Sequence, residues 1–511
     1  MSATPLTRRQ VLKSFGVLGG SSLMLGAMGA WDLKGAPAGP RPQLRGDQSS
    51  TRVLVLGAGL SGLVTGYELG KLNYDYQVLE ARERVGGLIW SVKRGDRHTE
   101  MDTGERQICD FDEGHYINAG AWRIPHSDEG VLGYCKELGV KLEVFINASN
   151  ANYFYEENPA IGPLSGQRVR LREVKADMWG ATTELLTKAM DRGDIDVPLS
   201  NEDKELLIQY LVRSGYLDST DHVYRPPTSR GSDDQLDLGA LLESGFWARA
   251  RSLNQETGGP APLFQPIGGM QQIPFAFERE LGDRISFGSE VRSVQQTEDD
   301  VRVVVRDTRT GEEREEVADY VVCCLPMSIL KKIDVNFSPT MAEAVQSTGH
   351  AAVAKMGLQM GRRFWEEDEG IYGGHLWSRS LQLGEFSYPC YDYFADKGVL
   401  LGYYGSSNQA GLADMPVRGR VEHVLTQASK VHPQIRDEFE HAYAVWWEKV
   451  EHSEGAYGRT PSDELLAQLS EPDGRLFIGC AGASFDPAWM EGAIESAWRS
   501  VESLHEHAMR G

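Results

Sequence analysis

A glycine-rich turn followed by an acid is the first pattern in this chain whose spacing predicts chemistry. Residues 57–62 read Gly-Ala-Gly-Leu-Ser-Gly and stand between an apolar, β-branched run at 52–56 and a helical pattern that extends to Leu72. In a strand–turn–helix unit, such glycines permit a tight turn, close approach of a pyrophosphate to backbone N–H groups, and close packing of the helix. A second apolar run ends at Glu80, whose carboxylate would accept hydrogen bonds from a ribose hydroxyl pair. The pattern predicts a dinucleotide site formed by Gly57, Gly59, Leu60, Ser61, Gly62 and Glu80.

The next stretch indicates which dinucleotide binds. Residues 80–87 read Glu-Ala-Arg-Glu-Arg-Val-Gly-Gly, so a basic residue and a Gly-Gly pair could supply a second set of pyrophosphate donors. Here the sequence resembles the flavin-containing amine oxidase family, and the resemblance implies FAD as the cofactor. It adds four cofactor-binding residues, Ala81, Arg82, Gly86 and Gly87. The arginine that usually follows the Gly-Gly pair is Leu88 in this chain, a departure that affects one expected phosphate contact.

The resemblance extends from about residue 51 to 505 and includes residues that would bind a substrate. Residues 120–125, Gly-Ala-Trp-Arg-Ile-Pro, are similar to a segment of the L-amino acid oxidases whose arginine pairs with the substrate carboxylate. Lys355 matches the family lysine that holds a water molecule against flavin N5, and Tyr403 matches a tyrosine whose hydroxyl also binds the carboxylate. The resemblance further implies cofactor contacts by Gly120, Ala121, Trp122 and Arg123.

The C-terminal part of the chain continues this resemblance. Trp447 matches a tryptophan packed on the flavin ring, and Val291 lies in a strand that would run alongside the adenine. Gly479 ends an apolar run, and Cys480 follows it where family members usually have an acid that binds the cofactor. The last segment matches a helix start that offers a backbone N–H to the flavin, with Ala488 accepting from the substrate amine, Trp489 facing the substrate and Met490 contacting the cofactor.

The resemblance therefore implies an FAD-dependent L-amino acid oxidase. A hydride would move from Cα to flavin N5, the imine would hydrolyse to a 2-oxo acid and ammonia, and O2 would be reduced to hydrogen peroxide. Four residues are the expected catalytic set: Lys355, Arg123, Tyr403 and Trp489. A guanidinium suits a carboxylate because it gives a planar, two-point grip.

Other readings stay open. The same scaffold could serve an amino acid 2-monooxygenase that releases an amide and CO2, an amine oxidase without carboxylate recognition, or a flavin-binding protein without catalytic activity. Arg123 could pair with a surface acid, Lys355 could extend along the surface to solvent, and Tyr403 and the tryptophans could be core residues. The side-chain specificity cannot be read from the sequence.

A folded scaffold must bring these residues together. We expect an α/β fold with a discontinuous, Rossmann-like (GR2-type) FAD-binding domain, a mixed-sheet substrate domain and a helical insertion. Residues 201–215 illustrate the insertion, because Leu206, Leu207, Tyr210 and Leu211 fall on one face of a predicted helix. The expected segments are 1–34 signal, 35–50 linker, 51–125, 263–335 and 465–507 FAD-binding, 126–262 helical and 336–464 substrate-binding.

The N-terminus and the composition bear on location and partners. Arg8 and Arg9 precede an uncharged run at residues 14–31, which resembles a twin-arginine export signal and predicts a periplasmic or secreted protein; a cytoplasmic location is the alternative. The glycine content of the run argues against a stable membrane span. The formal net charge of −22 opposes nucleic acid as a partner. Six cysteines without CxxC spacing and twelve histidines without metal-ligand spacing predict no metal site. We expect an L-amino acid and O2 as small-molecule partners, and a homodimer.

Overall fold

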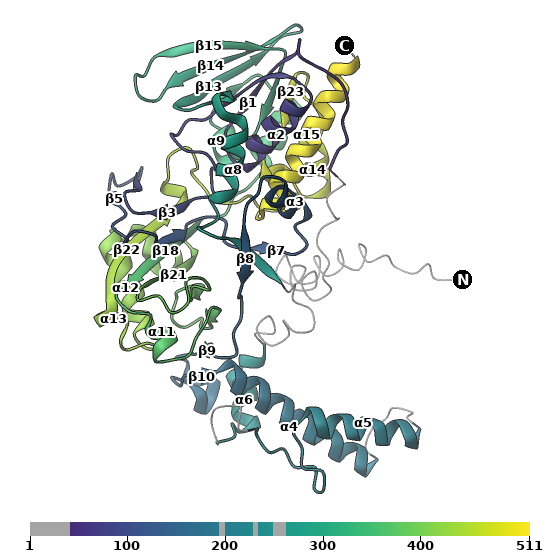
Figure 1. Ribbon diagram of the computed structural model, residues 1–511, viewed down its shortest axis with the longest axis vertical. Coiled ribbons are helices and arrows are strands. Elements are labelled where there is room, and N and C mark those ends of the chain that lie inside the picture. Colours follow the sequence, from purple (N-terminus) through teal and green to yellow (C-terminus); the bar gives the residue numbers. More distant parts are fainter. Residues whose placement is uncertain (1–40, 194–199, 228–233, 249–261, 511) are drawn as a thin grey trace.

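A computed structural model describes residues 41–193, 200–227, 234–248 and 262–510 (Figure 1). The predicted export signal at residues 1–34 lies outside the described residues, as does the first part of the predicted linker. Among the described residues, no helix is both long and apolar enough to cross a membrane. The elements form a mixed α/β molecule, as predicted.

A five-stranded parallel sheet lies at the centre of the upper part of the molecule in Figure 1. Its strands, in spatial order, are β12 (Ile285–Ser286), β2 (Asp75–Leu79), β1 (Arg52–Leu56), β16 (Tyr320–Cys323) and β23 (Leu476–Ile478). Four of the five residues of β1 are buried. Both faces of the sheet are covered, which explains why its strands read as nearly continuous apolar runs.

The two faces of this sheet pack on different layers. Val53 and Val55 point toward a helical layer made by α2 (Leu60–Lys71), α3 (Glu129–Glu137), α8 (Gln272–Leu281) and α15 (Met490–Arg510). Leu54 and Leu56, on the opposite face, pack toward a second sheet. That sheet has the order β15 (Glu313–Ala318), β14 (Val301–Asp307), β13 (Ser289–Gln296) and β17 (Asp334–Val335). The alternation of side chains along a strand therefore assigns each apolar residue to one layer.

A five-stranded antiparallel sheet forms the second major unit, at the left of Figure 1 near mid-height. Its order is β19 (His375–Leu376), β20 (Phe386–Ser387), β21 (Gly398–Ser406), β18 (Val353–Met360) and β22 (Phe439–Trp446). All eight residues of the central strand β18 are buried. One face packs in a core with helices α11 (Phe364–Glu367), α12 (Val417–Ala428) and α13 (Ile435–Glu438). The other face packs on residues 88–122, and the predicted site lies there.

A helical arm extends from the bottom of the molecule (Figure 1). It contains α4 (Leu171–Arg192), α5 (Asn201–Ser214) and α6 (Leu238–Ser244), and a small sheet of β7 (Ile124–Pro125), β11 (Leu263–Pro266) and β8 (Leu142–Phe145) connects it to the rest. Helix α5 forms where its periodicity predicts it, and the Ser200 side chain caps it by accepting from the Asp203 N–H. Its apolar face is not a core face, however, because only Leu211 of that helix is buried.

The remaining helices complete the covering layers. Residues of α10 (Pro339–Ser347) and α14 (Asp463–Ser470) pack in the core beneath the four-stranded sheet. Short strands β3 (Ser91–Lys93) and β6 (Tyr116–Asn118) pair with each other and lead the chain from the parallel sheet to the five-stranded antiparallel sheet. Consequently, residues 118–123 run between the two major units.

Candidate functional site

The glycine turn between β1 and α2 has the geometry that its sequence predicts. Gly57 has φ 96°, a left-handed conformation that favours glycine, and Gly59 caps the start of α2. A Cβ added to Gly62 would lie 1.8 Å from the Gly57 carbonyl oxygen, so the helix packs directly on the turn. A Cβ added to Gly59 would meet no atom within 4 Å. Open space therefore lies at the helix N-terminus, where backbone N–H groups attract anions.

Glu80 links the end of β2 to this turn. Its Oε2 accepts from the Ala58 N–H at 2.8 Å, its Oε1 accepts from the Arg82 N–H at 2.9 Å, and the residue is 5% exposed. The Gly86 N–H donates to the Ala58 carbonyl at 2.8 Å. The two predicted motifs, 57–62 and 80–87, thus lie against each other: Gly59 forms a β-bridge with Gly86, and a Cβ added to Gly87 would lie 3.2 Å from the Gly59 Cα. Ala81 follows Glu80 in the second motif.

Two arginines beside this surface lack a carboxylate partner close enough for an ion pair among the described residues. The Arg82 guanidinium donates to the Ser453 hydroxyl at 2.8 Å and to the Glu451 carbonyl, and the Arg84 guanidinium lies over the Trp90 ring at 4.7 Å. Burial lowers the pKa of both groups, and the charge of Arg82 lowers that of Arg84 further, to about 9. A bound anion would offset both effects, which is what a pyrophosphate would supply.

The segment 118–123 lies between the glycine turns and the five-stranded antiparallel sheet. The Lys355 ammonium donates to the carbonyl oxygens of Gly120 at 2.6 Å and Asn118 at 3.3 Å. The Trp447 indole N–H donates to the Ala119 carbonyl at 2.8 Å. A Cβ added to Gly120 would overlap the Leu88 carbonyl oxygen at 1.6 Å, so only glycine fits here. Lys355 and Trp447, which are far apart in sequence, therefore both bind backbone carbonyls of this short segment. Ala121 and Trp122 belong to the same segment.

Lys355 is a buried cation, 3% exposed, on the central strand β18. Burial lowers its pKa to about 7; the charge of Arg123 lowers it further, and Glu385 partly offsets this. The ammonium lies 4.3 Å from the centre of the Tyr404 ring and 5.2 Å from that of Trp122. At neutral pH this amine exists in both protonation states, so it can hold or release a proton at Nζ.

Arg123 projects into an aromatic environment next to this lysine. Its guanidinium carbon lies 4.8 Å from the Trp122 ring centre and 5.8 Å from that of Trp489. Its Nη1 is 3.8 Å from Glu385 Oε2, a distance at the outer limit of an ion pair. The side chain is 22% exposed, so part of the guanidinium is open to a small molecule. The arrangement can bind a carboxylate in the two-point manner that guanidinium groups favour.

The role predicted for Tyr403 does not fit its position. Tyr403 is fully buried on the far side of the sheet, stacks on Trp446 with ring centres 5.7 Å apart, and donates its hydroxyl to the Ser406 carbonyl at 2.6 Å. Tyr404 lies on the site face instead, directly opposite Lys355 across the two strands. The physical reason is a β-bulge: Met356 pairs with Tyr403 but Gly357 pairs with Leu401, so Gly402 is an extra residue that reverses the alternation.

The C-terminal residues lie at the junction of the parallel sheet and helix α15. Gly479 follows β23 and donates its N–H to the Cys323 carbonyl at 3.0 Å. Cys480 is buried with a free thiol, and burial raises its pKa to about 11, so it does not replace the charge of the missing acid. Helix α15 begins at Met490, directly after Trp489 and the exposed Ala488. Val291 is buried in β13, and the Ser289 N–H at the start of that strand donates to the Glu80 carbonyl at 2.8 Å.

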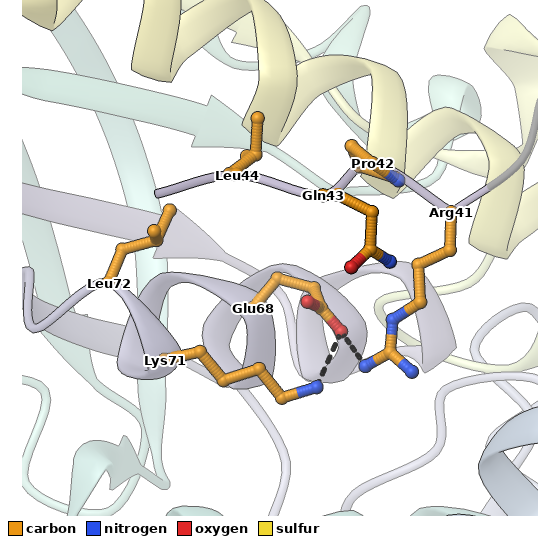
Figure 2. Close-up of a pocket in the computed structure, with 7 residues that line it drawn as sticks. All are labelled: Arg41, Pro42, Gln43, Leu44, Glu68, Lys71 and Leu72. Atoms are coloured by element: carbon orange, nitrogen blue, oxygen red, sulfur yellow. Dashed lines mark hydrogen bonds and ion pairs between the residues drawn. The ribbon is translucent and has the colours of Figure 1, made fainter. Parts of the chain in front are cut away.

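A surface pocket elsewhere contains none of these residues (Figure 2). It lies between the segment Arg41–Leu44 and helix α2, and its charges are paired within the chain, because Glu68 accepts from both Arg41 and Lys71. We assign no function to this pocket.

A comparison with protein families identifies the family of this chain. Residues 60–505 match the family described as flavin containing amine oxidoreductase. The chain belongs to this family. Its cofactor is therefore FAD, and it is a flavin-dependent oxidoreductase.

Individual flavin enzymes that the chain resembles are distant. It is 26% identical over 486 residues to the flavin-dependent L-tryptophan oxidase RebO of Lentzea aerocolonigenes, covering 89% of this chain and 98% of that protein. It is 21% identical over 480 residues to an L-amino-acid oxidase of Notechis scutatus scutatus, covering 90% and 87%. A putrescine oxidase structure with bound putrescine aligns with a TM-score of 0.58 at 19% identity, covering 90% of this chain and 99% of that one. At that identity the structural match establishes the fold alone.

The residues present fit FAD. The open space at Gly59 and the incompletely neutralised Arg82 and Arg84 would receive the pyrophosphate, and Glu80 is placed to receive a ribose. Leu88 packs against an apolar cluster with Trp90 and Trp447, so at this position the chain places apolar surface where the resemblance led us to expect a phosphate contact.

The structure adds three residues that sequence reasoning missed. Tyr404 was hidden by the bulge at Gly402. Glu385 precedes β20 and reaches Arg123 only through the fold. His375 is buried with its ring centre 5.3 Å from that of Trp122, its Nε2 lies 3.0 Å from Asn147 Oδ1, and burial lowers its pKa to about 4. The Tyr-Tyr pair at 403–404 was the one sequence signal available, since either tyrosine could face the site.

Proposed function

We propose that this flavin enzyme is an L-amino acid oxidase. One observation carries the proposal: Arg123, whose nearest carboxylate is 3.8 Å away, projects beside Lys355 among aromatic side chains. A cation in that position suits a substrate that carries a carboxylate next to its reacting amine. The relatives that act on L-amino acids support this assignment at low identity.

Each residue has a proposed task in this reaction. Arg123 binds the substrate carboxylate, and the Tyr404 hydroxyl, rather than that of Tyr403, adds a third contact. Trp489 and Trp122 exclude water and orient the Cα–H bond, while the Ala488 carbonyl accepts from the substrate amine. Lys355, neutral above about pH 7, can accept a proton at Nζ from a bound water or ammonium. When bound, FAD would supply a two-electron acceptor for oxidation of the substrate at Cα.

The cofactor contacts and the domain division follow from the same proposal. Residues 51–125, 263–335 and 465–507 would bind FAD, including the predicted contacts at Val291, Trp447, Gly479 and Met490. Residues 336–464 would form most of the substrate side, and 126–262 the helical insertion. We also propose that residues 1–34 direct export of the protein and that the protein forms a homodimer.

A second function has one observation in its favour. The Glu385 carboxylate faces Arg123 and could neutralise it, which would suit an amine without a carboxylate. An amino acid 2-monooxygenase would use the same scaffold and release an amide and CO2 instead.

Product analysis separates these functions. Purified holoenzyme is incubated with a panel of L-amino acids in air, and the products are identified by mass spectrometry. The proposal predicts a 2-oxo acid, ammonia and hydrogen peroxide in equal amounts. An amide with CO2 would identify the monooxygenase, and turnover of amines alone would contradict carboxylate recognition.

A further inference from the structure

Glu385 is the one acidic side chain that the described residues place directly against Arg123. It stands immediately before β20, and its backbone N–H donates to the Tyr404 carbonyl at 2.7 Å. The preceding Gly384 has φ 64°, and a Cβ there would lie 2.1 Å from the same carbonyl oxygen. The backbone at 384–385 is therefore held tightly against the strand residue that faces Lys355.

The carboxylate of Glu385 is incompletely satisfied. Its Oε2 is shielded from solvent and has no hydrogen-bond partner among the described residues, while the nearest cation, Arg123 Nη1, is 3.8 Å away. The side chain as a whole is 46% exposed, so it is not sealed in a core. A shielded carboxylate oxygen without a donor is costly unless a ligand supplies one. A substrate bound by Arg123 would lie beside this carboxylate and could supply the missing donor.

Charge counting indicates which donor suits the site. Hydride abstraction requires the neutral α-amine, so a reacting amino acid contributes the charge of its carboxylate and of its side chain. Above about pH 7, where Lys355 is neutral, Arg123 is positive and Glu385 negative, so a substrate with a neutral side chain leaves one uncompensated negative charge. An acidic side chain leaves two, and a cationic side chain leaves none. In a partly dry pocket, this balance favours a cationic side chain.

We propose that Glu385 determines specificity and that this site takes basic L-amino acids, whose side-chain cation pairs with Glu385 while the α-carboxylate binds Arg123. This inference rests on the proposed L-amino acid oxidase function and adds the substrate class to it. Glu385 acts here as a binding residue for the substrate side chain, and takes no part in the transfer of hydride or protons.

The test compares L-lysine with L-norleucine, which has the same chain length without the terminal amine. We measure kcat/KM for both with the FAD-loaded wild type, Glu385→Gln and Glu385→Asp. The wild type should prefer L-lysine by about tenfold or more, Glu385→Gln should lose most of that preference, and Glu385→Asp should retain part of it. Glu315→Gln, a change on the exposed strand β15, is the matched control and should leave the preference unchanged.

Each outcome decides the proposal separately from the function on which it rests. An unchanged lysine-to-norleucine ratio in Glu385→Gln, or a wild-type preference for L-norleucine, overturns the role of Glu385. An equal rise of kcat/KM for both substrates in Glu385→Gln also overturns it, because Glu385 would then only compete for Arg123. Oxidation of 1,5-diaminopentane without oxidation of either amino acid would instead overturn the proposed L-amino acid oxidase function. The flavin absorbance of each variant verifies that it is folded and loaded.

Discussion

Lys355 lies directly opposite Tyr404 across strands β18 and β21, with its ammonium 4.3 Å from the centre of the tyrosine ring. This pairing determines which face of the antiparallel sheet packs on residues 88–122. It places a buried, readily deprotonated amine, an aromatic ring and, through the Glu385–Tyr404 backbone contact, an acid on the same side. The site is therefore organised by strand register as much as by the identity of its residues.

The two adjacent tyrosines give a contrast that tests this register. Tyr404→Phe should raise KM for an L-amino acid about tenfold or more, the effect of one lost hydrogen bond to a charged group. Tyr403→Phe should leave KM unchanged and lower the free energy of unfolding by about 1 kcal/mol, because it loses the bond to the Ser406 carbonyl. Steady-state kinetics and chemical denaturation measure both. The reverse pattern would restore Tyr403 as the carboxylate ligand.

Substitutions of Arg123 should weaken the binding of substrates that carry a carboxylate. Arg123→Ala should lower kcat/KM for L-amino acids by about 100-fold or more, since it leaves a carboxylate unpaired in a partly dry pocket. Arg123→Lys should recover only part of the loss, because an ammonium lacks the planar two-point grip. A variant with unchanged kcat/KM would show that Arg123 serves only to pair with Glu385.

Substitutions of two glycines in the turn should affect cofactor binding and folding separately. Gly59→Ala projects a methyl group into open space, so the protein should fold but bind FAD weakly, seen as a low ratio of flavin to protein absorbance. Gly62→Ala would bring a Cβ within 1.8 Å of the Gly57 carbonyl oxygen and should lower the melting temperature of the FAD-free protein. Full flavin content in Gly59→Ala would mean that the pyrophosphate lies elsewhere.

The depressed pKa of Lys355 should appear in the pH dependence of stability. Its pKa falls from 10.5 to about 7 on folding, so the unfolded chain binds more protons between these values, and this contribution to stability rises with pH from about 7 to 10.5. Lys355→Met removes the effect. The variant should therefore melt higher than the wild type near pH 7, by a few degrees, and the gain should shrink toward pH 10. Melting curves of both FAD-free proteins across this range provide the measurement, and a constant difference would argue against a buried, depressed lysine.

The parts of the site that local sequence determines could be predicted from it. The turn at 57–62 and the acid at Glu80 form as expected, because the strand, the glycines and the helix that follow one another in sequence also lie together in space. Arg123 and Lys355 were found through resemblance to a family, and their proximity depends on segment 118–123 crossing between the two units. No local pattern predicts that crossing.

Two features were beyond sequence reasoning for identifiable reasons. The bulge at Gly402 reverses alternation within a strand that otherwise reads regularly, and it turns Tyr403 to the face of the sheet away from Lys355. The Glu385–Arg123 approach joins residues from different units, and nothing in the chain near Glu385 distinguishes it from other acids.

The apolar face of α5 was predicted correctly as a pattern, yet Leu206 and Tyr210 are 58% and 57% exposed. Periodicity alone does not show which apolar faces are covered.

The most direct test of the central claim is anaerobic mixing of the purified yellow protein with L-amino acids and with the corresponding decarboxylated amines. The flavin band near about 450 nm reports reduction of the cofactor. Our account predicts that L-amino acids bleach this band in the wild type, that the amines do so far more slowly, and that Arg123→Ala removes the difference. Bleaching by the amines alone, or an equal response to both in the wild type, would contradict recognition of a substrate carboxylate by Arg123.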